Sequence, residues 1–123
     1  MNESSVSTRH INLSYLLLMA DGDLPMQKLM LSMLLDEMPA QLEKMNLAFE
    51  QTDWHTLRRL SHKMKTTLSF VGNHELILAD HELVEELKTT QNEALIAECL
   101  HRLNELMPIA LEELKMVNES IEL

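Results

Sequence analysis

The sequence predicts an all-α fold, an antiparallel up-and-down four-helix bundle with a short extra N-terminal helix. Three observations predict it. The chain has only two Gly and three Pro in 123 residues, together with ten Met and abundant Leu and Glu, and this composition favours helices over strands. Apolar residues recur at steps of three and four along several segments. Turn and cap residues separate these segments by short connections, which favour antiparallel neighbours.

The chain is long enough for one domain with a core of its own. Residues 1–9 are polar, rich in Ser and without periodicity, so we expect a flexible N-terminal tail there. The remaining residues, 10–123, are expected to form a single helical bundle domain.

Two helices are predicted in the first half of the chain. Residues 11–19 can form one or two helical turns that lie over the bundle, and the sequence breaks at Gly22. Asp23 is expected to cap a long second helix, with Pro25 tolerated in its first turn. Pro39 removes one backbone hydrogen bond within this helix, so a kink is expected there. Its apolar stripe is Leu31, Leu35, Met38, Leu42, Met45 and Phe49.

Two shorter helices are predicted next. Asp53 is expected to cap the third helix, and Gly72 ends it at a position that favours glycine. Asn73 can cap a fourth helix, from Glu75 to about Lys88. The inward residues are Leu57, Leu60, Met64, Leu68 and Val71 in the third helix, and Leu76, Ala79, Leu83 and Leu87 in the fourth.

The last helix is predicted from a capping box, in which Thr90 is followed three residues later by Glu93. Pro108 should bend this helix. Its stripe is Ile96, Leu100, Leu103, Met107, Ala110, Leu114 and Val117. Cys99 lies beside the stripe and is most simply a thiol at the edge of the core.

Charge and composition exclude several classes of function. The formal net charge of −10 disfavours nucleic acid or an anionic membrane as a partner. A single Cys excludes an internal disulfide framework and is typical of a reducing compartment. The longest apolar run is too short to span a bilayer, and no secretory signal opens the chain, so we expect a cytoplasmic protein.

A short basic block around His62 stands out in this acidic chain. Residues 58–65 hold four of the ten Lys and Arg, and no acid occurs between Asp53 and Glu75. On a helical wheel His62 lies about 160° from the centre of the apolar stripe, so its imidazole should point outward. A histidine surrounded by positive charge indicates a bound negative group, and a phosphoryl group is the leading candidate.

The sequence around this histidine resembles the phosphorylation motif of histidine-containing phosphotransfer (HPt) domains of bacterial two-component phosphorelays. In that family an aliphatic residue follows the exposed His by two positions, Lys by three, commonly Gly by four and Gly by ten. Met64, Lys65 and Gly72 hold three of these places, and Thr66 replaces the glycine four residues on. The resemblance extends over most of the chain and implies a four-helix bundle with a short N-terminal helix.

The resemblance implies a phosphocarrier that depends on its partner for catalysis and is not itself an enzyme. His62 would take a phosphoryl group from, or give it to, the aspartate of a receiver domain, in a response regulator or a hybrid histidine kinase. The reference pKa of histidine, about 6.5, leaves an imidazole largely neutral and nucleophilic near pH 7. The receiver would supply the Mg²⁺, and no cofactor is expected on this chain. The family is mostly monomeric.

Other residues around the histidine receive roles as well. Lys65 is expected to stabilise the phosphoryl group, a role that the resemblance also assigns to it, and we hypothesise that the Thr66 hydroxyl donates a hydrogen bond to the same group. The predicted partner-binding residues are Arg58, Arg59, Lys63, Ser69 and Phe70. Met26, Met30 and Met33 form a second apolar strip on the long helix, which either the N-terminal helix covers, through Leu13, Leu16 and Leu17, or a partner contacts.

The sequence argues against two other classes of function. No two of the six histidines have the spacing that lets one helix supply two metal ligands, and the cations around His62 oppose a divalent ion. Serine or cysteine hydrolase chemistry lacks a Gly-rich elbow and an acid near His62. The alternative that remains is a non-phosphorylated helical adaptor, whose basic face docks an acidic protein partner.

Overall fold

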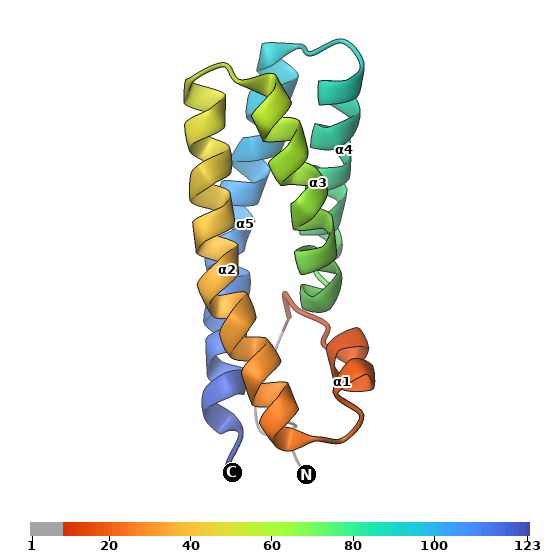
Figure 1. Ribbon diagram of the computed structural model, residues 1–123, viewed down its shortest axis with the longest axis vertical. Helices are drawn as coiled ribbons and strands as arrows, with labels where there is room; N and C mark the ends of the chain where they lie inside the picture. Colours follow the sequence, from red (N-terminus) through yellow and green to blue (C-terminus); the bar gives the residue numbers. More distant parts are fainter. Residues whose placement is uncertain (1–8) are drawn as a thin grey trace.

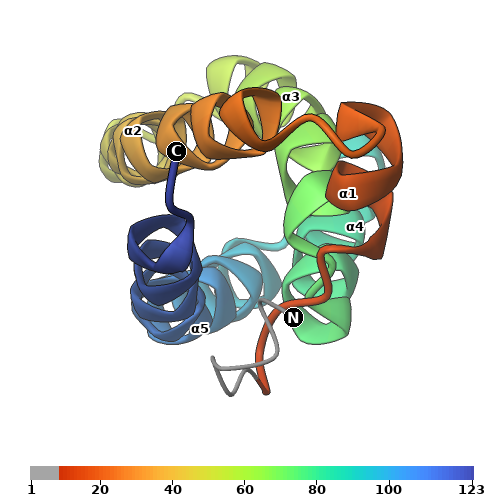
Figure 2. The same ribbon diagram turned by 90° about the horizontal axis from the view of Figure 1, so that it is seen from below.

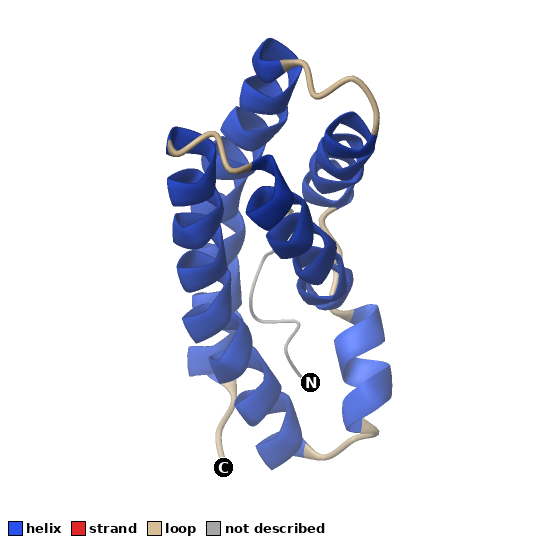
Figure 3. Ribbon diagram, turned by 45° about the horizontal axis from the view of Figure 1, so that its top comes forward, coloured by secondary structure: helices blue, strands red, loops and turns tan. Residues whose placement is uncertain are grey.

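The computed structural model describes residues 9–123, and within them the chain forms five α-helices and no strand (Figure 3). The helices are α1 (Ser14–Ala20), α2 (Leu24–Glu50), α3 (Trp54–Val71), α4 (His74–Lys88) and α5 (Glu93–Ser120). The predicted all-α class is therefore confirmed. The predicted tail lies, apart from Arg9, outside the described residues.

The four long helices pack in a ring, and α1 lies against it. Contacts join α2 to α3, α3 to α4, α4 to α5 and α5 back to α2, and Figure 2 shows these four helices around a common centre. Followed along the chain in Figure 1, α2 and α4 run upward while α3 and α5 run downward. α1 packs against α2 and α3. The helix that carries His62, α3, thus lies between α2 and α4.

Side-chain caps begin the four long helices. Asp23, Asp53 and Asn73 each accept a hydrogen bond from the backbone N–H three residues later, at 2.8–3.1 Å, as predicted. The predicted capping box at Thr90 is wrong. Asn92 caps α5 instead, by accepting from Leu95 N–H at 3.1 Å. The Thr90 hydroxyl donates to the Glu86 carboxylate at the end of α4 and so belongs to the preceding turn.

The predicted stripe of α2 is partly wrong. Leu35 and Phe49 are only half-buried, whereas Leu34, Gln41 and Ala48 are buried. The buried arc of α2 differs from the predicted stripe because this helix packs against α1, α3 and α5. Gln41 meets α3, where its side-chain oxygen accepts a hydrogen bond from the Thr67 hydroxyl at 3.2 Å. Phe49 packs instead against Trp54 at the α2–α3 turn, with ring centroids 5.7 Å apart. The residues correctly predicted are Leu31, Met38, Leu42 and Met45.

Both helices that contain an internal proline continue through it. α2 is helical on both sides of Pro39, and Figure 1 shows its orange N-terminal part tilted relative to its yellow C-terminal part. α5 is likewise continuous through Pro108. Each proline is exposed, so its ring lies on the solvent side of the helix and not in the core.

The inward residues predicted for α3, α4 and α5 are all buried. Together with the α2 residues they form one core cluster, in which each fully buried Leu or Met contributes roughly 1.5–3 kcal/mol. Cys99 is also buried, and burial raises the pKa of its thiol, which keeps it protonated near neutral pH. These helices therefore fix which face of α3 remains outside.

An extended segment before α1 crosses the end of α3. Asn12 donates its backbone N–H to the Val71 carbonyl at 2.9 Å. Gly72, which ends α3 with a φ of 71°, lies so close to Asn12 that a Cβ there would overlap its carbonyl. The Asn12 side chain also accepts from Ser14 N–H at 3.0 Å, so α1 begins at Ser14 rather than at Ile11 as predicted.

The same segment is held by α5. The Glu113 carboxylate accepts hydrogen bonds from the backbone N–H groups of Arg9 and His10, at 2.9 and 2.8 Å. Asn73 donates its side-chain amide to the His10 carbonyl at 2.7 Å. These contacts tie the beginning of the described chain to two helices at once. None of the helices in residues 9–123 is both long and apolar enough to cross a membrane.

Candidate functional site

His62 lies in the middle of α3 and is exposed, as the helical wheel predicts. The apolar stripe of α3 is drawn into the core, and this leaves the opposite face of the helix to solvent. That face carries the other residues of the predicted site, all of which are exposed except Phe70, which is half-buried. They are Arg58, Arg59, Lys63, Lys65, Thr66, Ser69 and Phe70.

Two cavities on the α3–α4 side meet at His62. The first has a volume of about 220 Å³, and His62 and Lys65 line it from α3 together with residues of α4, including Asp80 and His81. The second, of about 430 Å³, is lined by His55, Arg58, Arg59, His62, Val84 and Lys88. The structure thus brings Arg58, Arg59 and Lys65 to the cavities beside His62.

The structure also adds residues that the sequence analysis missed. Lys88 lies near His62 in both cavities, and His81 lies in the smaller one, although both belong to α4. Their position depends on the packing of α4 against α3, so no local sequence pattern could have identified them. Lys63, which was predicted to bind a partner, lines neither cavity.

The cations of α3 are free to act on a bound anion. Within residues 9–123 no ion pair shorter than 4.0 Å engages Arg58, Arg59 or Lys65. Lys88 is partly neutralised, since its ammonium lies 3.7 Å from the Glu85 carboxylate. Uncompensated positive charge at a partly enclosed site attracts anions more strongly than the same charge in bulk water.

A buried polar pair lies directly beneath this surface. Ser61, the residue before His62, is wholly buried and donates its hydroxyl to Asp80 Oδ1 at 2.6 Å. Asp80 is 2% exposed. Burial raises the pKa of its carboxyl to about 6, although the Ser61 hydrogen bond and the charge of Lys65 act in the opposite direction.

The sequence contained a signal for this pair. Ser61 lies four residues after Leu57 and three before Met64, and Asp80 lies four after Leu76 and three before Leu83. Both polar residues therefore fit the helical spacing of the buried stripes. They were missed because only apolar residues were counted as inward.

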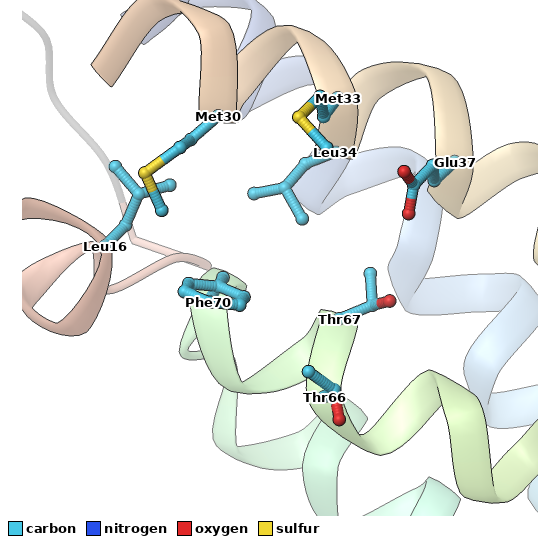
Figure 4. A pocket seen from close by; sticks show the side chains of 8 residues that line it. All are labelled: Leu16, Met30, Met33, Leu34, Glu37, Thr66, Thr67 and Phe70. Carbon is cyan, nitrogen blue, oxygen red and sulfur yellow. The ribbon is translucent and has the colours of Figure 1, made fainter. Parts of the chain in front are cut away.

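A third cavity lies on the other side of α3, toward α2 and α1. It has a volume of about 210 Å³ and is mostly apolar, and Figure 4 shows Met30, Met33 and Leu34 of α2 facing Phe70 of α3 across it. Thr66, one helical turn after His62, lies at its edge. The residues that line it are Leu16, Met30, Met33, Leu34, Glu37, Thr66, Thr67 and Phe70.

This third cavity, called the apolar groove below, concerns two predictions: that α1 covers Met26, Met30 and Met33, and that Ser69 and Phe70 contact a partner. α1 reaches it through the buried Leu16, while Met26 and Met33 remain 42% and 49% exposed. α1 therefore covers this strip only in part: Met30 is half-buried, whereas Met26 and Met33 remain open to solvent. Phe70 stacks on Tyr15 of α1, with ring centroids 5.0 Å apart. The Ser69 hydroxyl donates to the Thr66 carbonyl at 2.6 Å.

The geometry defines a class of site: an exposed imidazole, set among cations on the outer face of a helical bundle. No three His, Cys, Asp or Glu side chains of residues 9–123 gather as ligands for a metal ion. In a comparison with protein families, the model of the Hpt domain matches residues 29–116. The chain therefore belongs to the Hpt domain family, as its resemblance predicted. Comparisons with curated proteins and with solved structures find no match.

Membership of this family establishes the general class of function. Hpt domains are helical phosphocarrier modules, not catalysts, and they work with receiver domains in the phosphorelays of two-component signalling. The matched residues include all of α3 and α4, and hence His62 and both cavities beside it.

Proposed function

We propose that this protein is a histidine phosphocarrier, in which His62 accepts a phosphoryl group from the aspartate of a receiver domain and donates it to one. One observation carries the proposal. Within the residues that match the family, His62 is exposed between two cavities that also hold Arg58, Arg59 and Lys65. We take the scaffold to be an antiparallel up-and-down four-helix bundle, which holds α3 rigid while a partner docks.

The proposed reaction is a direct transfer between two side chains. A neutral ring nitrogen of His62 attacks the phosphorus of the receiver's aspartyl phosphate. The new N–P bond forms as the P–O bond breaks, and the aspartate leaves as a carboxylate with the bonding electron pair. Such transfer depends on in-line positioning and on neutralising the charge of the phosphoryl oxygens. The receiver supplies the aspartate and the Mg²⁺, so the reaction needs a partner.

Lys65 and Thr66 are proposed to stabilise the phosphoryl group on His62. Lys65 lies one helical turn after His62 on the same face, lines the same cavity and has no close ion-pair partner in the described residues. Thr66 is exposed one turn after His62, on the side of α3 that faces the apolar groove. Its hydroxyl can donate a hydrogen bond to the phosphoryl oxygens.

The surrounding residues are proposed to bind the receiver. Arg58, Arg59 and Lys63 would attract its acidic face and raise the association rate more than the affinity. Phe70 lines the apolar groove together with Thr66, and Ser69 is exposed and donates its hydroxyl to the Thr66 carbonyl, so both can contact a partner that covers Thr66. We further propose that residues 10–123 act as one monomeric, cytoplasmic domain without a nucleic-acid or membrane partner, in line with the net charge of −10.

The experiment that tests the proposal measures phosphate on His62. The protein is incubated with receiver domains that have been phosphorylated with acetyl phosphate, and we expect an acid-labile, alkali-stable phosphate on this chain. His62→Gln should abolish it. His101→Gln is the matched control, since His101 is exposed on α5, away from the site, and should leave transfer unchanged. Stable binding of receivers without any label would contradict the proposal and favour the non-phosphorylated adaptor.

A further inference from the structure

The buried carboxyl of Asp80 has no part in the mechanism above, yet it lies one layer beneath the reacting histidine. It is 2% exposed and accepts a 2.6 Å hydrogen bond from Ser61, the residue next to His62. A buried carboxyl with a single neutral donor is costly to ionise. An aspartate at such a position therefore calls for a reason beyond packing.

The surroundings of Asp80 connect it to the site. It shares the cavity of about 220 Å³ with His62 and Lys65 of α3. The other titratable or charged residues of that cavity are His81, Glu85 and Lys88 of α4, and α5 contributes none of its lining. Of these, Lys65 is the one whose charge acts on the Asp80 carboxyl. The two residues are thus coupled although no ion pair within 4.0 Å joins them.

We propose that Asp80 is a positioning residue that controls Lys65: ionised, it draws the Lys65 ammonium toward the buried end of the cavity, and it takes up a proton when His62 is phosphorylated. This inference rests on the proposed phosphorylation of His62. Asp80 would act on the phosphoryl group through Lys65 and through the field in the cavity, without touching the group itself.

The direction of the effect follows from the charges. A phosphoryl group brings nearly two negative charges to His62, and these oppose the negative carboxylate of Asp80 in the same cavity. Asp80 then takes a proton from solvent and becomes a neutral carboxylic acid, which releases Lys65 to the phosphoryl oxygens. Because burial already raises the pKa of Asp80 to about 6, a modest further rise brings this protonation into the neutral range.

The coupling must be reciprocal. If phosphorylation of His62 favours protonated Asp80, then protonated Asp80 favours phosphorylated His62 by the same factor. A rise of about one unit in the pKa of Asp80 corresponds to an effect of about tenfold on the phosphorylation equilibrium. Acidification from pH 7.5 to 5.5 would therefore shift the equilibrium toward phosphohistidine.

The first test follows Asp80 directly in the unaltered protein. Carboxyl-carbon NMR measures the pKa of Asp80 before and after His62 is phosphorylated chemically with phosphoramidate, and His62→Gln treated in the same way corrects for the other histidines. We expect a rise on the order of one unit. An Asp80 pKa that does not change on phosphorylation of His62 would overturn the inference and leave the proposed function standing.

The second test uses Asp80→Asn, which keeps the shape and can still accept the Ser61 hydrogen bond but cannot ionise. With one receiver domain as the exchange partner, the equilibrium ratio of phosphorylated to free His62 should be about tenfold higher in this variant than in the wild type at pH 7.5. The two ratios should converge at pH 5. Glu112→Gln, which removes an exposed carboxylate of α5, should follow the wild type throughout.

The outcomes separate the two proposals. A difference between Asp80→Asn and the wild type that is equal at every pH would indicate a structural role and contradict the inference. A lower ratio in Asp80→Asn would also contradict it, because the sign would be reversed. Failure of His62 to accept phosphate from receivers and from phosphoramidate alike would instead contradict the proposed function, and the inference with it.

Discussion

Ser61 and His62 are neighbours in the sequence and point about 100° apart around α3, which places one in the core and the other in solvent. Ser61 is wholly buried against α4, whereas His62 is exposed between two cavities. The same turn of α3 therefore carries the buried hydrogen bond from Ser61 to Asp80 and the exposed imidazole of His62. A substitution at Ser61 should act on how α3 is held, while a substitution at His62 should act on chemistry and leave the core intact.

Lys65 carries the clearest prediction at the scale of a single residue. Lys65→Met keeps the length of the side chain and removes its charge, so transfer to His62 should slow about 10- to 100-fold. Thr66→Gly should act in the same direction by a smaller factor. Rapid-quench measurements of transfer from a phosphorylated receiver give the rates.

A matched control separates this local effect from a general loss of positive charge. Lys115→Met removes an exposed cation from α5 and should leave the rate unchanged. If Lys65→Met transferred as fast as Lys115→Met, the assignment of Lys65 to the phosphoryl group would be wrong.

Residues that act through local rules were predictable from the sequence, and those that depend on packing were not. Gly72 and the caps Asp23, Asp53 and Asn73 were correct because backbone geometry determines them within one turn. At the α4–α5 turn, Thr90 and Asn92 are both good caps, and local rules could not choose between them. Lys88 could not be assigned to the site from the sequence, because it approaches His62 only through the packing of α4 against α3.

At the scale of elements, the stripes of α3, α4 and α5 were predicted correctly and that of α2 was not. The α2 helix packs against α1, α3 and α5. Leu34 and Ala48 are therefore buried, whereas Leu35 is only half-buried. A stripe drawn through the most apolar residues assumes a single buried direction. That assumption fails where a helix has several neighbours.

The α3–α4 pair gives a prediction for stability against pH. The pKa of Asp80 is about 6 in the folded protein and 3.8 for a free side chain, so the folded state holds the proton more tightly. The contribution of protonated Asp80 to stability is fully present below about pH 4 and is lost as the pH rises through about 6. Relative to Asp80→Asn, the wild type should lose about 3 kcal/mol over this range.

Urea unfolding, followed by far-ultraviolet circular dichroism at several values between pH 4 and 7, measures this difference. Other carboxylates titrate in the same range, but they are common to both proteins and cancel in the comparison. A difference in the free energy of unfolding that stays constant with pH would show that burial does not raise the pKa of Asp80.

At the scale of the whole molecule, charge is distributed unevenly. The chain carries twenty acidic and ten basic residues, yet the face of α3 around His62 holds Arg58, Arg59, Lys63 and Lys65 without an acid of its own. An acidic partner is repelled by most of the surface and attracted at one place. The field of the molecule therefore favours encounters that bring the partner to His62.

This distribution predicts a dependence on salt. Arg58→Ala combined with Arg59→Ala should lower the second-order rate constant of phosphotransfer about tenfold at low salt. The difference should shrink above about 0.5 M NaCl, because the Debye length then falls to a few ångströms. Stopped-flow or quench measurements across a salt series test it. Equal salt dependence in the variant and the wild type would indicate that these arginines do not steer the partner.

The aromatic contacts at the two ends of α3 give the molecule built-in optical probes. The chain has one Trp and one Tyr: Trp54 packs on Phe49 at the α2–α3 turn, and Tyr15 stacks on Phe70 beside the apolar groove. Each chromophore therefore senses a different end of the helix that carries His62. Tryptophan emission follows melting of the α2–α3 end, and the near-ultraviolet signal of the tyrosine follows detachment of α1, so the order in which the two ends open can be observed without any label.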